Sequence, residues 1–252
     1  MISVRNLTKK YGALTAVDDL NLDVDRELFI FLGPNGAGKT TTIKMMTGLL
    51  KPSNGSVMID GVNLAEHPLQ AKQLFGVVTE QPYLYEKLTA REFVTFMATV
   101  YSVPLTDAGK RMGQLFEIFE MSDRMDDLIE NFSHGMKQKV ALIGALIHNP
   151  RVLFLDEPTT GLDPRAAYNL KEILRGLVKK GTTIFLSTHI LEMAEKMCDR
   201  VGIINKGKLQ VLGTMDELLK RSENHAGTLE ELFLEITGLS DSGDLEDFLE
   251  AT

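Results

Sequence analysis

The sequence predicts an α/β fold built on a mostly parallel sheet. In the second half of the chain, short apolar runs of strand length alternate with segments of helical length, the pattern of strands joined by helices. One apolar run, residues 28–32, leads directly into the glycine-rich string GPNGAGKTT at 33–41 and then into a helical segment. Residues 83–131 have a helical character instead, which predicts a helical lobe inserted into the α/β core.

In the amino-terminal part we expect strands at 2–4, 20–24, 28–32, 57–59 and 75–78, with a helix over 40–50. Asp60 and Gly61 follow the fourth of these strands and indicate a hairpin or tight corner. The first strands should form an antiparallel flank to the parallel sheet.

The helical lobe begins with a capping box, in which Thr89 and Glu92 are spaced to satisfy each other's backbone N–H groups. A first helix should then bury Phe93, Met97, Val100 and Tyr101 on one face. A second helix is expected around residues 106–120, with Leu115, Ile118 and Phe119 as its apolar positions.

After the lobe, the pattern predicts a buried helix over 136–147 and a strand at 152–155. The next helix should begin at Asp163 as N-cap, with Pro164 at its first position. A strand at 182–186, a helix at about 189–198 and strands at 201–204 and 209–212 follow. We therefore expect a core domain at 1–215, with the lobe at about 83–140, and an acidic amphipathic tail at 216–252.

Bulk composition limits the class of protein. The 252 residues are 44% hydrophobic and 25% charged, as in ordinary globular proteins. A net charge of −8 argues against a surface that coats nucleic acid. The one cysteine, Cys198, cannot form an internal disulfide, which suits a reducing cytosol. The amino terminus lacks a signal-peptide core, and the longest strongly apolar stretch, 140–147, is far too short to span a membrane.

The string at 33–41 fits the phosphate-binding pattern G-x-x-x-x-G-K-[ST]. A strand, a glycine turn and a helix start aim several backbone N–H groups at one anion. Lys39 should reach the β- and γ-phosphates, and the Thr40 hydroxyl should ligate Mg²⁺. We expect a nucleoside triphosphate to be held by Gly33, Pro34, Asn35, Gly36, Ala37, Gly38, Lys39, Thr40 and Thr41.

The strand at 152–155 runs into two carboxylates, Asp156 and Glu157. A strand-terminal aspartate beside a phosphate loop is where Mg²⁺ is held, directly or through water. The glutamate that follows is well placed to polarise an attacking water, which favours hydrolysis over transfer to a large acceptor.

Five segments occur in one order: Tyr11-Gly12, GPNGAGKTT, NFSHGMKQK, VLFLDEPTTGLDP and STH. Together they make the chain resemble the nucleotide-binding subunit of an ATP-binding-cassette (ABC) transporter, over residues 1–215. The motif HGMKQK and the segment TLEELFLEITG at 228–238 most resemble the corresponding segments of ATPase subunits that are paired with ABC-2-type exporters.

The resemblance implies roles at matching positions. Tyr11 should stack on adenine, and His189 should be the switch histidine that reads the γ-phosphate and the attacking water. Ser133 and Gly135 fall in the signature motif, which binds the ATP of the opposite subunit. Asp163 matches the aspartate that communicates across the dimer interface.

The chain departs from the family pattern at two places. The signature usually reads LSGGQ, and here His134 stands in place of a glycine. At the usual glutamine of the Q-loop the chain has Glu80, whose carboxylate could bind Mg²⁺ or water. A slip of one residue that lets Gln81 serve is the alternative.

The resemblance also implies the partners: a separate transmembrane permease, a second cassette subunit in a homodimer or heterodimer, and no nucleic acid. The subunit would then be cytoplasmic and peripheral on the inner face of the membrane, with ATP and Mg²⁺ as cofactors and export as its direction. Tyr83, Leu84 and Tyr85 would form the groove for the permease, or would simply pack the lobe.

Two rival functions belong to other classes. A soluble cassette ATPase that acts on DNA usually carries a long coiled coil before the signature, and the 94 positions from Lys39 to Ser133 (133 − 39) are too few. Members that act on ribosomes usually hold two cassettes in one chain. The second rival is a regulatory module that binds ATP without hydrolysing it, but all the expected catalytic groups except the Q-loop glutamine are present.

Overall fold

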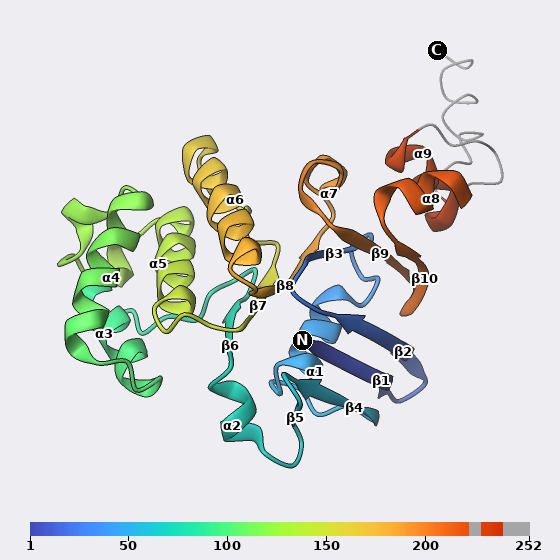
Figure 1. Cartoon of the computed structure of the whole chain (residues 1–252), viewed down its shortest axis with the longest axis horizontal. Coiled ribbons are helices and arrows are strands. Elements are labelled where there is room, and N and C mark those ends of the chain that lie inside the picture. The colour runs from blue at the N-terminus through green and yellow to red at the C-terminus, as the bar shows by residue number, and fades with distance from the viewer. Residues whose placement is uncertain (222–227, 239–252) are drawn as a thin grey trace.

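The computed structural model describes residues 1–221 and 228–238. It contains two sheets, one of six strands in the order β10-β9-β3-β8-β7-β6 and one of four strands in the order β2-β1-β4-β5 (Figure 1). The expected α/β fold, with a mostly parallel sheet, an antiparallel flank and an inserted helical lobe, is confirmed.

In the six-stranded sheet, five neighbouring strands run parallel. They are β6 (Phe75–Val78), β7 (Val152–Asp156), β8 (Thr183–Thr188), β3 (Leu28–Leu32) and β9 (Arg200–Asn205), and β10 (Lys208–Gly213) closes the edge antiparallel to β9. Leu32 pairs with Thr188, and Asp156 pairs with Ser187. The carboxyl ends of β3, β8 and β7 therefore meet at one edge, and the segments after them start side by side.

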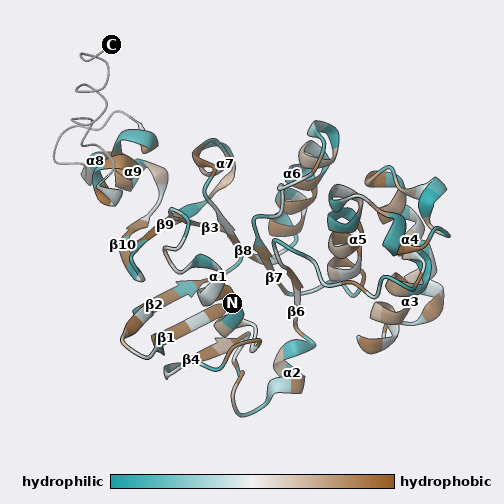
Figure 2. Cartoon of the chain, turned by 180° about the vertical axis from the view of Figure 1, so that it is seen from behind, coloured by the Kyte–Doolittle hydropathy of each residue, from teal (hydrophilic) through white to brown (hydrophobic). Residues whose placement is uncertain are grey.

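Alternation along these strands fills a separate core on each face of the sheet. Leu28, Ile30 and Leu32 belong to the core shared with the lobe and the carboxyl-terminal helices. Phe29 and Phe31 belong to the core shared with the four-stranded sheet, where their rings pack around Phe185 with centroids 5.3–5.4 Å away. The central strands accordingly carry hydrophobic residues along most of their length (Figure 2).

The four-stranded sheet is wholly antiparallel and consists of β1 (Ile2–Tyr11), β2 (Leu14–Val24), β4 (Asn54–Ile59) and β5 (Val62–Asn63). Its strands are longer than the apolar pattern predicts, because register shifts let the β1–β2 ladder continue past interruptions in the pattern. Asp60 and Gly61 have φ of 48° and 81° and close the predicted hairpin between Ile59 and Val62.

Two helices lie between the first strands. Helix α1 (Lys39–Met46) ends earlier than predicted, because Thr47 is its C-cap and Gly48 follows with φ of 68°. The prediction of helix as far as residue 50 was wrong. The short helix α2 (Pro68–Lys72) was not predicted.

The helical lobe comprises α3 (Ala90–Val100), α4 (Leu105–Ile118), two 3₁₀ turns (Ser122–Arg124 and Ile129–Asn131) and α5 (His134–Leu146). The Thr89–Glu92 capping box is confirmed. Val100 and Ile118 are exposed, so the two predicted apolar faces are only partly right. Helix α5 packs on both α3 and β6 and joins the lobe to the central sheet in one hydrophobic core.

The remaining helices are α6 (Pro164–Lys179), α7 (Leu191–Met197), α8 (Met215–Arg221) and α9 (Leu229–Thr237). Asp163 caps α6 by accepting from the Ala166 N–H, as predicted. Helix α9 buries Leu229, Leu232 and Phe233, and its Ile236 carbonyl accepts from Asn205 Nδ2. The rest of the predicted acidic tail, 239–252, lies outside the described residues. Across the described part of the chain, every helix falls short of the length and apolar character that crossing a bilayer requires.

His148 lies where the lobe meets the sheet. Its ring stacks on Tyr101 at 3.6 Å between centroids and 9° between planes, and its Nε2 is 3.2 Å from the Phe75 carbonyl oxygen. Burial lowers the pKa of His148 from 6.5 to about 4, because the protonated ring would lose its water.

This low pKa links folding to pH. Below pH 6.5 the unfolded chain binds a proton at His148, whereas the folded chain does so only near pH 4, so folding is weakened as the pH falls through that window. Between about pH 7 and about pH 4.5, we expect the wild type to lose roughly 2–3 kcal/mol more unfolding free energy than His148→Phe, measured by urea denaturation. Parallel pH profiles for the two proteins would contradict this linkage.

Candidate functional site

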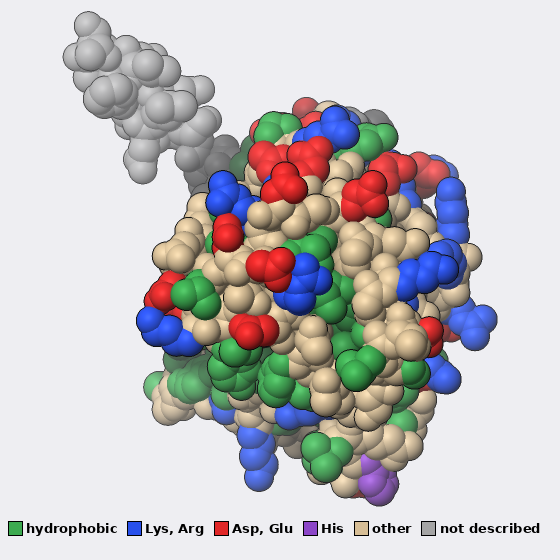
Figure 3. All heavy atoms as spheres, turned by 90° about the vertical axis from the view of Figure 1, so that its left-hand side faces the viewer, with side chains coloured by type: hydrophobic (Ala, Val, Ile, Leu, Met, Phe, Trp, Pro, Cys, Tyr) green, Lys and Arg blue, Asp and Glu red, His purple; other side chains and the backbone are tan. Residues whose placement is uncertain are grey.

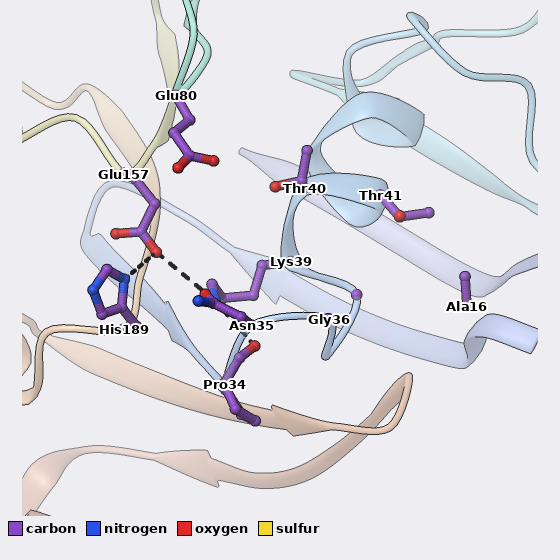
Figure 4. A pocket seen from close by; sticks show the side chains of 11 residues that line it. Ala16, Pro34, Asn35, Gly36, Lys39, Thr40, Thr41, Glu80, Glu157 and His189 are labelled. Atoms are coloured by element: carbon purple, nitrogen blue, oxygen red, sulfur yellow. Dashed lines mark hydrogen bonds and ion pairs between the residues drawn. The ribbon is translucent and has the colours of Figure 1, made fainter. Parts of the chain in front are cut away.

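A pocket of about 390 Å³ opens at the carboxyl edge of the six-stranded sheet (Figure 4). Four parts of the chain meet there: the loop after β3 with the start of α1, the loop after β6, and the residues that follow β7 and β8. Strand β2 adds one residue. The lining consists of Ala16, Pro34, Asn35, Gly36, Gly38, Lys39, Thr40, Thr41, Glu80, Glu157 and His189.

The backbone of the loop after β3 can be built only with glycine at certain positions. Gly38, the N-cap of α1, has φ of 110°, and a Cβ atom there would lie 2.6 Å from the Ala16 carbonyl oxygen. A Cβ atom at Gly33 would lie 2.5 Å from the Ile204 carbonyl oxygen. The loop therefore lies tightly against β2 and β9, with the first N–H groups of α1 at the pocket.

Lys39 is 6% exposed, and its Nζ donates to the carbonyl oxygens of Gly33 at 2.7 Å and Pro34 at 3.3 Å. The same Nζ lies 3.7 Å from Glu157 Oε1. A buried ammonium group at a helix start, inside a glycine loop, is a strong binding site for phosphate.

Glu157 is 5% exposed and has a left-handed backbone with φ of 47°. Its N–H donates to the Ser187 carbonyl oxygen at 3.0 Å, which fixes the turn after β7 against β8. The Thr188 hydroxyl donates to Oε2 at 3.0 Å, and His189 Nδ1 lies 2.9 Å from Oε1. Both carboxylate oxygens are thus oriented by the end of β8. If His189 Nδ1 carries the proton, its Nε2 is left as an acceptor.

Asp156 is 1% exposed, and its Oδ1 accepts a hydrogen bond from the Ser187 hydroxyl. It is not one of the residues that line the pocket, whereas Thr40 and Glu80 are. Among the described residues no group of three or more His, Cys, Asp or Glu side chains is placed to hold a metal by itself. Mg²⁺ commonly uses one or two protein oxygens and completes its shell with phosphate and water, so a hydroxyl and nearby carboxylates fit it.

The two alternatives for the Q-loop residue are placed differently. Glu80 lines the pocket opposite Thr40 (Figure 4). Gln81 is exposed, and its carbonyl oxygen accepts from the Thr79 hydroxyl at 2.8 Å. Of the two side chains, the carboxylate of Glu80 is the one at the site.

Tyr11 ends β1 and is 49% exposed, with Lys9 Nζ 5.1 Å from its ring centroid. It stands apart from the described residues that line the pocket, which on this side include Ala16. Sequence reasoning missed Ala16. Nothing in its side chain marks it, since its part in the site is a backbone contact with Gly38.

Ser133, Gly135 and Asp163 form a second cluster, also separate from the described lining residues. Ser133 is the exposed N-cap of α5, and its Oγ accepts from the Met136 N–H at 3.3 Å. Asp163 lies 2.7 Å from Lys139 Nζ, and this hydrogen bond lowers the pKa of its carboxyl below the ordinary value. An exposed helix start with a hydroxyl can bind an anion that another molecule presents.

Comparison with known proteins gives a consistent result. Residues 17–160 match the family model described as "ABC transporter". The chain is 36% identical over 222 residues to the linearmycin resistance ATP-binding protein LnrL of Bacillus subtilis, covering 88% of this chain and 71% of that protein. It is 39% identical over 227 residues to the bacitracin transport ATP-binding protein BcrA of Bacillus licheniformis, covering 89% and 73%.

Two solved structures are also similar. One, described as the ATP-binding subunit of an ABC transporter, has a TM-score of 0.89 and 35% identity, covering 93% of this chain and 98% of the other. The second is the dimeric ATP-binding cassette MJ0796 in a post-hydrolysis state with ADP and Pi, with a TM-score of 0.78 and 26% identity, covering 85% and 99%.

Gly38→Ala should disable the pocket. The added methyl would overlap the Ala16 carbonyl oxygen in a left-handed backbone, so the loop must move off β2. We expect at least a roughly tenfold loss of affinity for a fluorescent ATP analogue, measured by titration.

Gly61→Ala is the matched control, because its φ is 81° and no heavy atom lies within 4 Å of the new methyl. It should cost about 1–2 kcal/mol of stability and leave affinity unchanged. Equal affinities for wild type and Gly38→Ala would contradict the role of close packing on β2.

Proposed function

The chain belongs to the ABC transporter family as an ATP-binding subunit, and we propose that it hydrolyses ATP in the pocket between Lys39, Glu157 and His189 to drive export by a separate membrane permease. One observation carries the proposal. The Glu157 carboxylate is held between the phosphate-binding lysine and a histidine, 3.7 Å from one and 2.9 Å from the other.

ATP would enter with its phosphates on the glycine loop. The N–H groups at the start of α1 and the Lys39 ammonium neutralise the β- and γ-phosphates. Ala16 lines the same pocket next to Gly38 on the β2 side, and Tyr11, at the end of the neighbouring strand, supplies an exposed ring for stacking on adenine. Stacking gives affinity for the base without reading its hydrogen-bonding edge.

Magnesium fits the oxygen groups around this pocket. Thr40 would ligate it directly, and the buried Asp156 and the pocket-facing Glu80 would hold it directly or through water. When bound, it supplies positive charge that offsets the charge on the phosphate oxygens.

Glu157 would accept a proton from the attacking water. Thr188 and His189 fix its two oxygens, so the carboxylate is oriented before the reaction. His189, which lines the pocket beside Glu157, would help to orient the γ-phosphate and the attacking water. Because phosphoryl transfer depends mostly on positioning and charge stabilisation, such an oriented base is effective.

A second cassette subunit, either another copy of this chain or a related one, would complete the site. Ser133 and Gly135 present a helix start to the outside, away from the pocket of their own chain. In a head-to-tail dimer each chain's helix start would bind the γ-phosphate held by the other chain. The similar cassette MJ0796 is described as dimeric, which supports this arrangement.

The permease would dock on the lobe. Tyr83 is 93% exposed and Tyr85 60%, and Tyr85 stacks edge-on against Phe96 at 5.4 Å. Tyr85 and Phe96 line a groove of about 400 Å³ together with Lys87 and Leu88. Hydrophobic side chains gather on this side of the molecule between charged ones (Figure 3). An exposed aromatic groove suits an amphipathic segment of a partner.

Leu84, which the sequence groups with these tyrosines, packs against the lobe core instead. Docking on a permease would place the subunit at the inner face of the membrane, where ATP is available. Two relatives named for linearmycin resistance and bacitracin transport support export as the direction.

Glu157→Gln should retain ATP binding but reduce turnover by a hundredfold or more, because a neutral amide cannot accept the proton. Phosphate release measures turnover, and size-exclusion chromatography with ATP should show a persistent dimer. Glu192→Gln, an exposed change on α7, is the control and should behave as wild type. Normal turnover by Glu157→Gln would remove Glu157 from the role of base.

Replacing both Tyr85 and Phe96 with Ser should release the subunit from membranes that contain its permease, measured by co-sedimentation. ATPase activity should stay near wild type, because the groove lies outside the nucleotide pocket. Tyr168→Ser removes an equally exposed ring from α6 and should leave sedimentation unchanged. Full retention of the double variant on membranes would exclude this groove as the docking site.

A further inference from the structure

The start of α5 is packed directly against the loop at 158–163, which follows Glu157. A Cβ atom at Gly135 would overlap the Gly161 carbonyl oxygen, so the two backbones are in contact. One turn further along α5, Lys139 Nζ lies 2.7 Å from the Asp163 carboxylate. Two contacts thus hold the loop to the helix that begins at Ser133.

His134, which stands where the signature usually has a glycine, adds a third contact. A Cβ atom at Gly161 would lie 2.5 Å from His134 Cδ2 and 3.4 Å from Nε2, and the three nearest heavy atoms all come from this imidazole. The ring therefore occupies the space where any other residue at 161 would place its side chain. Gly161 also has φ of 77°, which favours glycine for a second reason.

Gly161 is linked to Glu157 by a short, closed turn. The Thr160 N–H donates to the Glu157 carbonyl oxygen at 3.1 Å, and the Leu162 N–H donates to the Thr159 carbonyl oxygen at 3.1 Å. A turn closed in this way transmits a shift at Gly161 to the backbone of Glu157. That backbone already has a left-handed conformation, so the position of its carboxylate depends on the turn being held.

We propose that His134 is a positioning residue for ATP hydrolysis: its imidazole, seated on Gly161, fixes the loop 158–163 to the start of α5 and thereby sets the placement of Glu157. The inference rests on the proposed function, since it assumes that Glu157 is the base. In this proposal His134 acts within its own chain, through its contact with Gly161. A phosphate bound at Ser133 by a partner would then act on Glu157 through this contact.

The opposing possibility is that His134 touches the partner's phosphate directly. The two roles separate in steady-state kinetics. Loss of a phosphate contact raises the KM for ATP and the ATP concentration needed to form dimers, whereas loss of positioning lowers kcat at unchanged KM.

The test compares His134→Ala and His134→Phe in the full-length chain, with phosphate release for kcat and KM and a fluorescent ATP analogue for binding. We expect His134→Ala to lower kcat by roughly tenfold, with KM and binding within about twofold of wild type, because a small displacement of a catalytic group has a large effect on rate. His134→Phe keeps a flat ring on Gly161 and should recover most of kcat.

A double-mutant cycle probes the contact itself. Gly161→Ala strains a left-handed backbone in both backgrounds and also places a methyl into the ring of His134, so it should lower kcat more in the wild-type background than in His134→Ala, where only the strain remains. Gly181→Ala is the control, since its φ is 89° with open space around it, and its effect should be the same in both backgrounds.

An unchanged kcat in His134→Ala, a raised KM at unchanged kcat, or additive effects in the cycle would each overturn the inference. These outcomes are distinct from a failure of the proposed function, which Glu157→Gln reports separately. If Glu157→Gln is inactive and His134→Ala has normal kcat, the positioning role of His134 is wrong and the proposed function still stands.

Discussion

The site depends on the parallel register of β3, β8 and β7. Leu32 pairs with Thr188 and Asp156 with Ser187, so the chain leaves all three strands at the same edge of the sheet. The pocket follows from that alignment, because each of its main parts comes directly after one of these strands. The glycine loop follows β3, Glu157 follows β7 and His189 follows β8. A slip of one position in any of these strands would turn its side chains to the other face and separate these groups. The buried alternation of Leu and Phe residues, with a different core on each side, is what prevents such a slip.

Charge at this edge is arranged for binding rather than for stability. Lys39 and Glu157 are both almost fully buried, and the 3.7 Å between them is longer than a good hydrogen bond. Removing two charges from water at that separation gives little net stabilisation, and removing either partner alone leaves the other charge uncompensated. An ammonium group whose other contacts are two backbone carbonyls can exchange them for phosphate oxygens without leaving its pocket.

Much of this could be predicted from sequence, because the relevant signals are local. The strand at 28–32, the strand at 75–78 and the caps at Thr89 and Asp163 depend on residues adjacent in the chain, and the structure has them as predicted. What sequence reasoning missed depends on contacts between distant segments. Ala16 reaches the pocket because its backbone lies next to Gly38. The length of β1 is set by its ladder with β2. Val100 is exposed because the neighbours of α3 decide which face of that helix is covered. The choice between Glu80 and Gln81 likewise needed the direction in which each side chain points.

Glycine marks two helix-start surfaces, one at α1 and one at α5, and for the same physical reason. At Gly33 and Gly38 a side chain would strike a backbone carbonyl of β9 or β2, and at Gly135 it would strike the backbone of the loop 158–163. In each case a helix start is pressed against a neighbouring segment so that its N–H groups stay open to an anion. Glu157 lies between the two surfaces, tied to the first by Lys39 and to the second by the turn that reaches Gly161. The Glu157 carboxylate is therefore connected to both helix starts, and the close backbone packing at each of them constrains where this carboxylate lies.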